Sequence, residues 1–211
     1  MFQTTLIFLS FALIHSIMIA GWFRNLCVRV FGETFMKAWY RFIFVLVSFV
    51  VVTIAGLLII DIPDRPLWTA PPVLRWTMHA VQICAAFFFM LTFRILDAGE
   101  FLGIRQVIRY LRRGETAGNI EGLTERELVT TGVYGIVRHP MYVAGIVLLT
   151  CNPHVTMNSL AITVLGCLYF LFGMFIEERR FVKIFGDQYR EYMQKVPRMV
   201  PRITWGQRKD G

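Results

Sequence analysis

The residues best suited to chemistry flank one long uncharged stretch of the sequence. The pentapeptide "RHPMY" places Arg138, His139 and Tyr142 at its start, and Glu177 and Glu178 follow its end. If the stretch folds as a hairpin, its two ends meet. Basic and acidic side chains there could form a structural salt-bridge cluster. They could also hold a zwitterionic ligand, whose carboxylate would meet the cations and whose ammonium would meet a glutamate.

The elements that position these residues are predicted to be membrane spans. The chain has 211 residues, of which 56% are hydrophobic and 17% charged, whereas a soluble domain carries roughly 25% charged residues. Uncharged runs at 4–23, 42–60 and 76–93 are each long enough to cross a bilayer. The stretch 141–176 is interrupted by "CNPHVTMNS", which indicates a turn between two short or kinked arms. The sequence predicts an all-α integral membrane protein with about five transmembrane helices, and it shows no strand pattern.

The basic residues predict how the helices cross the membrane. All of the 22 lysines and arginines except Arg65 and Arg75 fall on one side of the predicted spans. The positive-inside rule makes that side cytoplasmic, so we expect the N-terminus outside and the C-terminus in the cytoplasm, in an inner or plasma membrane. The net charge of +8 is then a topology signal and an attraction to anionic lipid rather than a sign of nucleic-acid binding.

Two cytoplasmic segments carry a helical pattern. "GEFLGIRQVIRYLRRGE" is typical of a basic amphipathic helix that lies on the membrane or continues the third span. "EERRFVKIFGDQYREYMQKVP" carries a stripe of Phe and Tyr, which we interpret as packing on the membrane surface without chemistry. We therefore divide the chain into three N-terminal transmembrane helices (1–96) and a catalytic region (97–211). The catalytic region consists of a cytoplasmic connector, the hairpin and a C-terminal helix.

Other reactive residue types point to structural roles. The four cysteines are scattered, so neither a metal site nor a disulfide is predicted. His15 and His79 lie within predicted spans without a clustered carboxylate or cysteine, which favours helix–helix hydrogen bonds.

Several separated blocks resemble one family of membrane enzymes. "LVTTGVYGIVRHPMYVAG", "CNP", "EER" and "FGDQYREYMQKVPRMVP" are similar, in this order, to the C-terminal half of the isoprenylcysteine carboxyl methyltransferase family. That family also includes phospholipid methyltransferases and methanethiol S-methyltransferases. The match covers residues 128–201, and the first three spans look more like methanethiol methyltransferases or nitric-oxide-regulation proteins of the same broad group.

The resemblance implies a cofactor and a set of roles. The methyl donor would be S-adenosylmethionine, with His139 and Tyr142 on its methionine part and the backbone around Val129, Gly132 and Tyr134 along its adenosine. Glu177 or Glu178 would hold its amino group or the local arginine. The resemblance implies Arg138, His139, Tyr142 and Glu178 as catalytic candidates, and of these His139, Tyr142 and Glu178 are possible proton acceptors.

The acceptor is harder to infer from the sequence. Ala144 stands where the family signature usually has glycine, and "GCLYFLFGMFIEE" lacks the arginines that eukaryotic prenylcysteine enzymes carry before the glutamates. A carboxylate in lipid needs a charge partner, so we expect a lipophilic or small thiol or amine acceptor, unless Arg105, Arg138 or Arg180 supplies the charge. Two alternatives stay open: an NADPH-dependent enzyme of the sterol-reductase type, and a non-enzymatic membrane protein of the nitric-oxide-regulation type.

Overall fold

The computed structural model describes residues 1–116 and 128–201 and is almost entirely helical. The predicted catalytic region 97–211 is therefore described only in part, because 117–127 and 202–211 lie outside the described residues. The elements in chain order are α1 (Phe2–Ile19), α2 (Gly21–Phe31), α3 (Glu33–Ile60), β1 (Pro66–Thr69), α4 (Pro72–Ile95), α5 (Ala98–Phe101), α6 (Ile104–Arg113), α7 (Val133–Ile136), α8 (Pro140–Thr150), β2 (His154–Thr156), α9 (Met157–Phe185) and α10 (Asp187–Lys195).

Four helices, α1, α3, α4 and α9, are long and apolar enough to cross a membrane. Large apolar side chains on their surfaces, such as Phe49, Trp76 and Phe172, are mostly exposed, as expected of residues that face lipid. The predicted all-α integral membrane fold is confirmed. It is built on runs of apolar residues whose backbone polar groups are satisfied within each helix.

The fifth predicted arm, α8, is much shorter than the others. Its 11 residues span about 16 Å, or roughly half of the hydrocarbon layer. Pro140 occupies the first turn, where a missing N–H costs nothing, and the helix ends at Thr150, with Cys151 as its C-cap just before Asn152 and Pro153. The hairpin is thus unequal, because α9 continues to Phe185.

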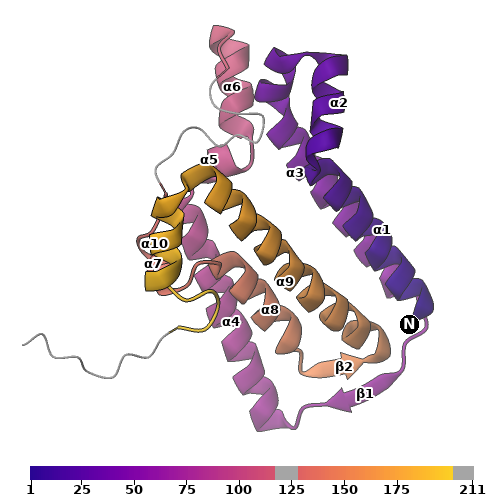
Figure 1. Cartoon of the computed structure of the whole chain (residues 1–211). Coiled ribbons are helices and arrows are strands. Elements are labelled where there is room, and N and C mark those ends of the chain that lie inside the picture. Colours follow the sequence, from indigo (N-terminus) through magenta and orange to yellow (C-terminus); the bar gives the residue numbers. More distant parts are fainter. Residues whose placement is uncertain (117–127, 202–211) are drawn as a thin grey trace, which may run out of the picture.

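A short strand pair that the sequence did not predict closes the end of the bundle near the N-terminus. β1 and β2 pair antiparallel, with Trp68 opposite Val155 (Figure 1). Beside it, the Asn158 side chain accepts hydrogen bonds from the N-terminal ammonium at 3.0 Å and from the Thr4 hydroxyl at 2.7 Å, while its backbone N–H donates to Asp64. These contacts tie the start of α1 to the start of α9.

The helices form two groups on either side of α9. Figure 1 shows α8 between α4 and α9, while α1 and α3 pack together and α1 contacts the other side of α9. The end of the bundle opposite the strand pair carries α2, α6 and α10. The start of α8 and the end of α9 meet at this second end, as the hairpin model predicted.

The predicted connector helix is broken rather than continuous. Leu96 and Asp97 separate it from α4, and the Asp97 carboxylate caps α5 by accepting from the N–H groups of Gly99 and Glu100. Gly103 then adopts a φ of +80°, and the backbone of Arg41 and Phe42 leaves no room for a β-carbon there, so only glycine fits. The connector therefore does not continue the third span; α6 packs against α3.

The aromatic stripe at the C-terminal end packs inside the protein. Tyr189, Tyr192 and Val196 are buried, and Phe181 and Phe185 cover them. This agrees with the interpretation of the stripe as packing, but the partner is the chain itself rather than the membrane surface.

Candidate functional site

The segment that leads into α8 is fixed by the segment that follows α10. The backbone N–H of Arg138 donates to the Pro197 carbonyl at 2.9 Å, and that of His139 donates to the Arg198 carbonyl at 3.3 Å. The Arg138 guanidinium also donates to the carbonyls of Met193 and Val196, at 2.8 and 2.7 Å. The residues of "RHPMY" are therefore held by contacts with a distant part of the sequence.

Glu178 is the centre of a buried charge network. Its Oε1 accepts from Arg138 Nε and Nη2 at 2.9 and 2.7 Å, and His139 Nε2 lies 3.1 Å away. Arg198 donates to both carboxylate oxygens, with Nη2 at 2.5 Å from Oε2 and Nε at 3.1 Å from Oε1. The side chains of Glu178 and Arg138 are only 5% and 7% exposed. This carboxylate has little capacity left for a ligand, and its role in the structure is to hold the two arginines.

Glu177 has a different environment, although it is the neighbouring residue. Its carboxylate lies 3.3 Å from His139 Nδ1 and its side chain is 35% exposed. The Tyr142 hydroxyl lies within electrostatic range of it, and the Tyr142 ring packs edge-on against His139 with centroids 5.5 Å apart. Of the two glutamates proposed for the donor, Glu177 is thus the accessible one, and Glu178 holds the local arginine.

The three residues proposed for the adenosine precede α8. Gly132 has a φ of +62° at the start of α7 and lies against the Ile95 side chain. The carbonyl of Tyr134 accepts from the Tyr192 hydroxyl at 2.6 Å; burial raises the pKa of Tyr192 to about 12, so it stays a neutral donor. Val129 is half-buried at the beginning of this segment. The hydrogen bond between Tyr134 and Tyr192 thus attaches α7 to α10, next to the charge network.

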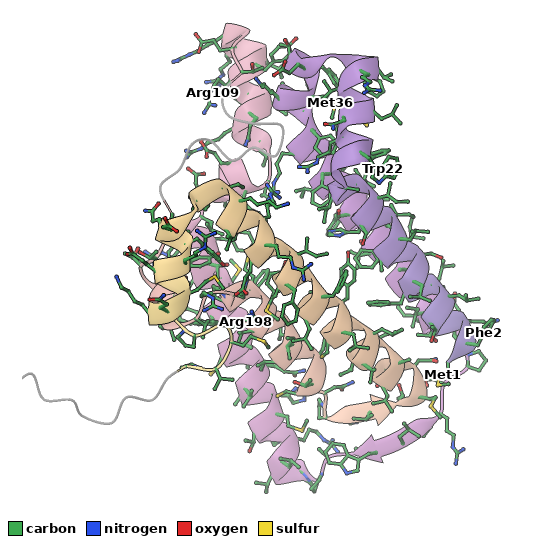
Figure 2. All side chains as sticks on the ribbon, in the orientation of Figure 1. Met1, Phe2, Trp22, Met36, Arg109 and Arg198 are labelled. Carbon is green, nitrogen blue, oxygen red and sulfur yellow. The ribbon has the colours of Figure 1, made fainter. Side chains whose placement is uncertain are left out.

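Arg198 is the member of the network that sequence reasoning missed. It follows α10 (Figure 2), and besides binding Glu178 its guanidinium lies 4.5 Å from the centroid of the Phe175 ring. Its place between Pro197 and Pro201 in one of the family-like blocks was a usable signal.

The three arginines considered as charge partners for an acceptor lie in different places. Arg105 pairs with Asp97 on an exposed surface, and Arg138 is committed to Glu178. Arg180 instead lines a pocket with Arg24 and Arg41, which come from the N-terminal helices. The stretch 141–176 lacks a cation, as the sequence indicated, but Arg180 lies just beyond it on α9, and Arg24 and Arg41 come from α2 and α3.

The two histidines within the spans differ in their partners. His15 Nδ1 lies 2.9 Å from the Tyr169 hydroxyl and joins α1 to α9, as expected. The expectation is wrong for His79, which bonds to Gln82 in its own helix at 3.0 Å. Among the described residues, no group of three or more metal-ligating side chains could hold a metal ion.

Comparison with known proteins places the chain in a family. The model of the family described as "NnrU protein" matches residues 3–204. The chain is 26% identical over 200 residues to methanethiol S-methyltransferase 2 of Bradyrhizobium diazoefficiens, covering 95% of this chain and 73% of that protein. It is 30% identical to methanethiol S-methyltransferase 1 of the same organism, covering 64% of this chain and 48% of the relative.

A second group of relatives matches a smaller part of the chain. Protein-S-isoprenylcysteine O-methyltransferase B of Arabidopsis thaliana is 35% identical over 122 residues, which are 55% of this chain and 59% of the plant protein. No solved structure matches the chain. These relatives support a membrane methyltransferase.

We predict that Glu178→Gln destabilises the protein, whereas Glu191→Gln on the exposed face of α10 does not. Removing one member of a buried ion pair leaves the other uncompensated, at a cost of about 3 kcal/mol or more. For a chain of this size, that lowers the melting temperature by roughly 2–4 °C per kcal/mol. Thermal unfolding in detergent measures both variants. Equal melting temperatures would show that the network does not hold the fold together.

Proposed function

This chain belongs to the NnrU protein family, and we propose that it transfers a methyl group from S-adenosylmethionine to a lipophilic or small thiol or amine acceptor at the cytoplasmic face of the membrane. The observation that carries this proposal is the pair Glu177 and Glu178. One carboxylate is neutralised by two arginines, and its neighbour remains accessible beside an imidazole and a phenol. The methyltransferase relatives supply the reaction type.

The side chains present fit the methionine part of such a donor. Glu177 offers a carboxylate for the ammonium, with His139 and Tyr142 fixing its position. The Arg198 side chain is 35% exposed, compared with 7% for Arg138, so it can hold the donor's carboxylate while still paired with Glu178. Gly132 and Tyr134 would lie along the adenosine, on the side of α10.

The protein contributes alignment rather than reactive groups. The donor supplies an electrophilic methyl group on a sulfonium when bound. His139 and Tyr142 orient that end of the site through Glu177, and the apolar walls of α8 and α9 exclude water. Arg138 is a positioning residue, because it holds Glu178 and the segment after α10 rather than an open site.

A thiol or amine acceptor must lose a proton. Glu178 is poorly suited to accept it, because its oxygens already receive bonds from both arginines. The two ring nitrogens of His139 face the carboxylates of Glu177 and Glu178, at 3.3 and 3.1 Å, and a neutral phenol such as Tyr142 is a weak proton acceptor, so the geometry favours none of the three residues considered from the sequence.

We propose that the site faces the cytoplasm. The end of the bundle that carries α2, α6, α10 and the charge network holds the described lysines and arginines other than Arg65 and Arg75. An alkaline phosphatase reporter, which is active only outside, is expected to be inactive after Lys195 and active when inserted in the loop 62–65. Activity after Lys195 would reverse the orientation.

We predict that Glu177→Gln weakens binding of S-adenosylhomocysteine ten- to a hundredfold, because a charge-assisted contact is worth about 1.5–3 kcal/mol. The melting temperature should change little, because Glu177 is partly solvated. Titration calorimetry in detergent measures the affinity, with Glu191→Gln as the control of equal charge. Unchanged affinity would remove Glu177 from the donor site. Binding of NADPH instead would favour a reductase, and binding of neither ligand a non-enzymatic protein.

The acceptor class is tested by a methyl-transfer assay with the purified chain. Four acceptors separate the possibilities: a thiol, a phospholipid amine, a quinol-like phenol and a farnesylcysteine analogue. We expect turnover of the thiol or the amine, since the hairpin carries no cation between 141 and 176. Turnover of the farnesylcysteine carboxylate alone would contradict this expectation.

A further inference from the structure

The proposed reaction releases a proton from the acceptor, and the donor site offers no well-placed group to take it. An imidazole is the side chain that most often serves as a proton acceptor in enzymes. The chain has four histidines, all within the part of the chain that the structure describes. His139 lies between two glutamates. His79 bonds within its own helix, and His154 lies in β2 at the other end of the bundle. These contacts leave His15 to be considered.

His15 lies within a span, where an ionisable side chain is costly and often functional. Its Nδ1 is 2.9 Å from the Tyr169 hydroxyl, which also lies 3.1 Å from the Ser16 hydroxyl. Phe11 and Phe44 pack against the imidazole, with ring centroids 5.7 and 5.0 Å away. Because the printed partner of Nδ1 is a phenol rather than a carboxylate, this nitrogen can receive the phenol's proton when the ring carries its own proton on Nε2.

A structural tie between α1 and α9 does not require these residue types. Thr4 bonds to Asn158 and His15 to Tyr169, and both pairs are separated by 154 residues in the sequence. The two helices therefore run side by side in one register. The first pair is buried, whereas His15 and Tyr169 are half-buried and Ser16 is exposed. The second pair is thus accessible from the lipid-facing surface, unlike the first.

One row of residues on α9 joins this pair to the donor site. Tyr169, Gly173 and Glu177 follow each other at intervals of one helical turn, about 6 Å apart, and all three are half-buried. The Tyr142 hydroxyl lies against the middle of the row, 3.4 Å from the place where a β-carbon on Gly173 would be. It is also within electrostatic range of both Tyr169 and Glu177. The row therefore leads from the glutamate proposed for the donor to the phenol that contacts His15.

We propose that His15 takes the proton of a thiol acceptor through the Tyr169 hydroxyl, with the acceptor's sulfur beside Gly173. The inference rests on the proposed function and narrows its acceptor to a thiol. A bond forms between this sulfur and the methyl carbon while the donor's sulfonium–methyl bond breaks, and the electron pair of the broken bond stays on the donor's sulfur.

The proton moves in two linked steps. The acceptor's proton passes to the Tyr169 oxygen while the phenol's own proton passes to His15 Nδ1, which leaves a neutral phenol and an imidazolium. The imidazolium returns the proton to water before the next turnover. Tyr169 contacts the acceptor, and His15 acts through Tyr169.

The test compares His15→Asn with His79→Asn, the same substitution in another span. The asparagine oxygen can still accept from the Tyr169 hydroxyl, so the tie between the helices is kept, but an amide does not take up a proton. With butanethiol as acceptor, His15→Asn is expected to lower kcat at least tenfold, since general-base catalysis typically contributes about 10²–10⁴-fold. Its melting temperature and its affinity for S-adenosylhomocysteine should stay close to those of the wild type. His79→Asn should leave kcat unchanged.

A second acceptor separates proton transfer from alignment. 4-Nitrothiophenol is already ionised at neutral pH and has no proton to give up, so His15→Asn should methylate it as fast as the wild type does. Tyr169→Phe, which removes the hydroxyl, is expected to show the same contrast between the two thiols. If His15→Asn does not fold, the contrast in Tyr169→Phe decides.

Two results in the variants would overturn the inference: unchanged kcat with butanethiol, or an equal loss with both thiols, which is the mark of a purely structural tie. Failure of the wild type to methylate either thiol would overturn it as well. The proposed function fails only if the wild type also leaves the amine and the other acceptors unmethylated, so the two failures are distinguishable.

Discussion

The rest of the site depends on one buried carboxylate. Taking Glu178 and Arg138 out of water is costly, and only close pairing offsets that cost. Arg138 also donates to backbone carbonyls after α10, and Arg198 approaches Glu178 from the same segment. The start of α8, the end of α9 and the chain beyond α10 are therefore held together by one charge. Each of them would leave a buried ionic group unpaired if it moved away.

Because Glu178 is paired with the two arginines, the two adjacent glutamates have different environments. Successive helical residues project about 100° apart, so a helix that buries Glu178 places Glu177 at the edge of the buried network. Arg180 then falls on the opposite side, facing α1 and α3. One helix thus separates the polar Glu177 site from a pocket on the side of α1 and α3. Such an arrangement suits a reaction between a water-soluble donor and an acceptor from the membrane.

The positions of the spans followed from the sequence, because a long uncharged run is a local property. The meeting of Arg138 and His139 with the glutamates also followed, because the two ends of a hairpin lie together. The end of the short α8 followed as well, because Asn152 and Pro153 are a local turn signal, whereas the strand pair did not, since β1 and β2 are far apart in the sequence. Arg198 was missed because its partner Glu178 is far along the chain and a tail carries no periodic pattern. The arginine pocket was missed for the same physical reason: it exists only once α2 and α3 pack beside α9.

The most direct measurement is an experimental structure of the full chain with S-adenosylhomocysteine bound. The account predicts the ligand's ammonium within hydrogen-bond distance of the Glu177 carboxylate, with Glu178 still paired to Arg138 and Arg198. A ligand bound away from Glu177, or held by Glu178 after release of its arginines, would contradict it.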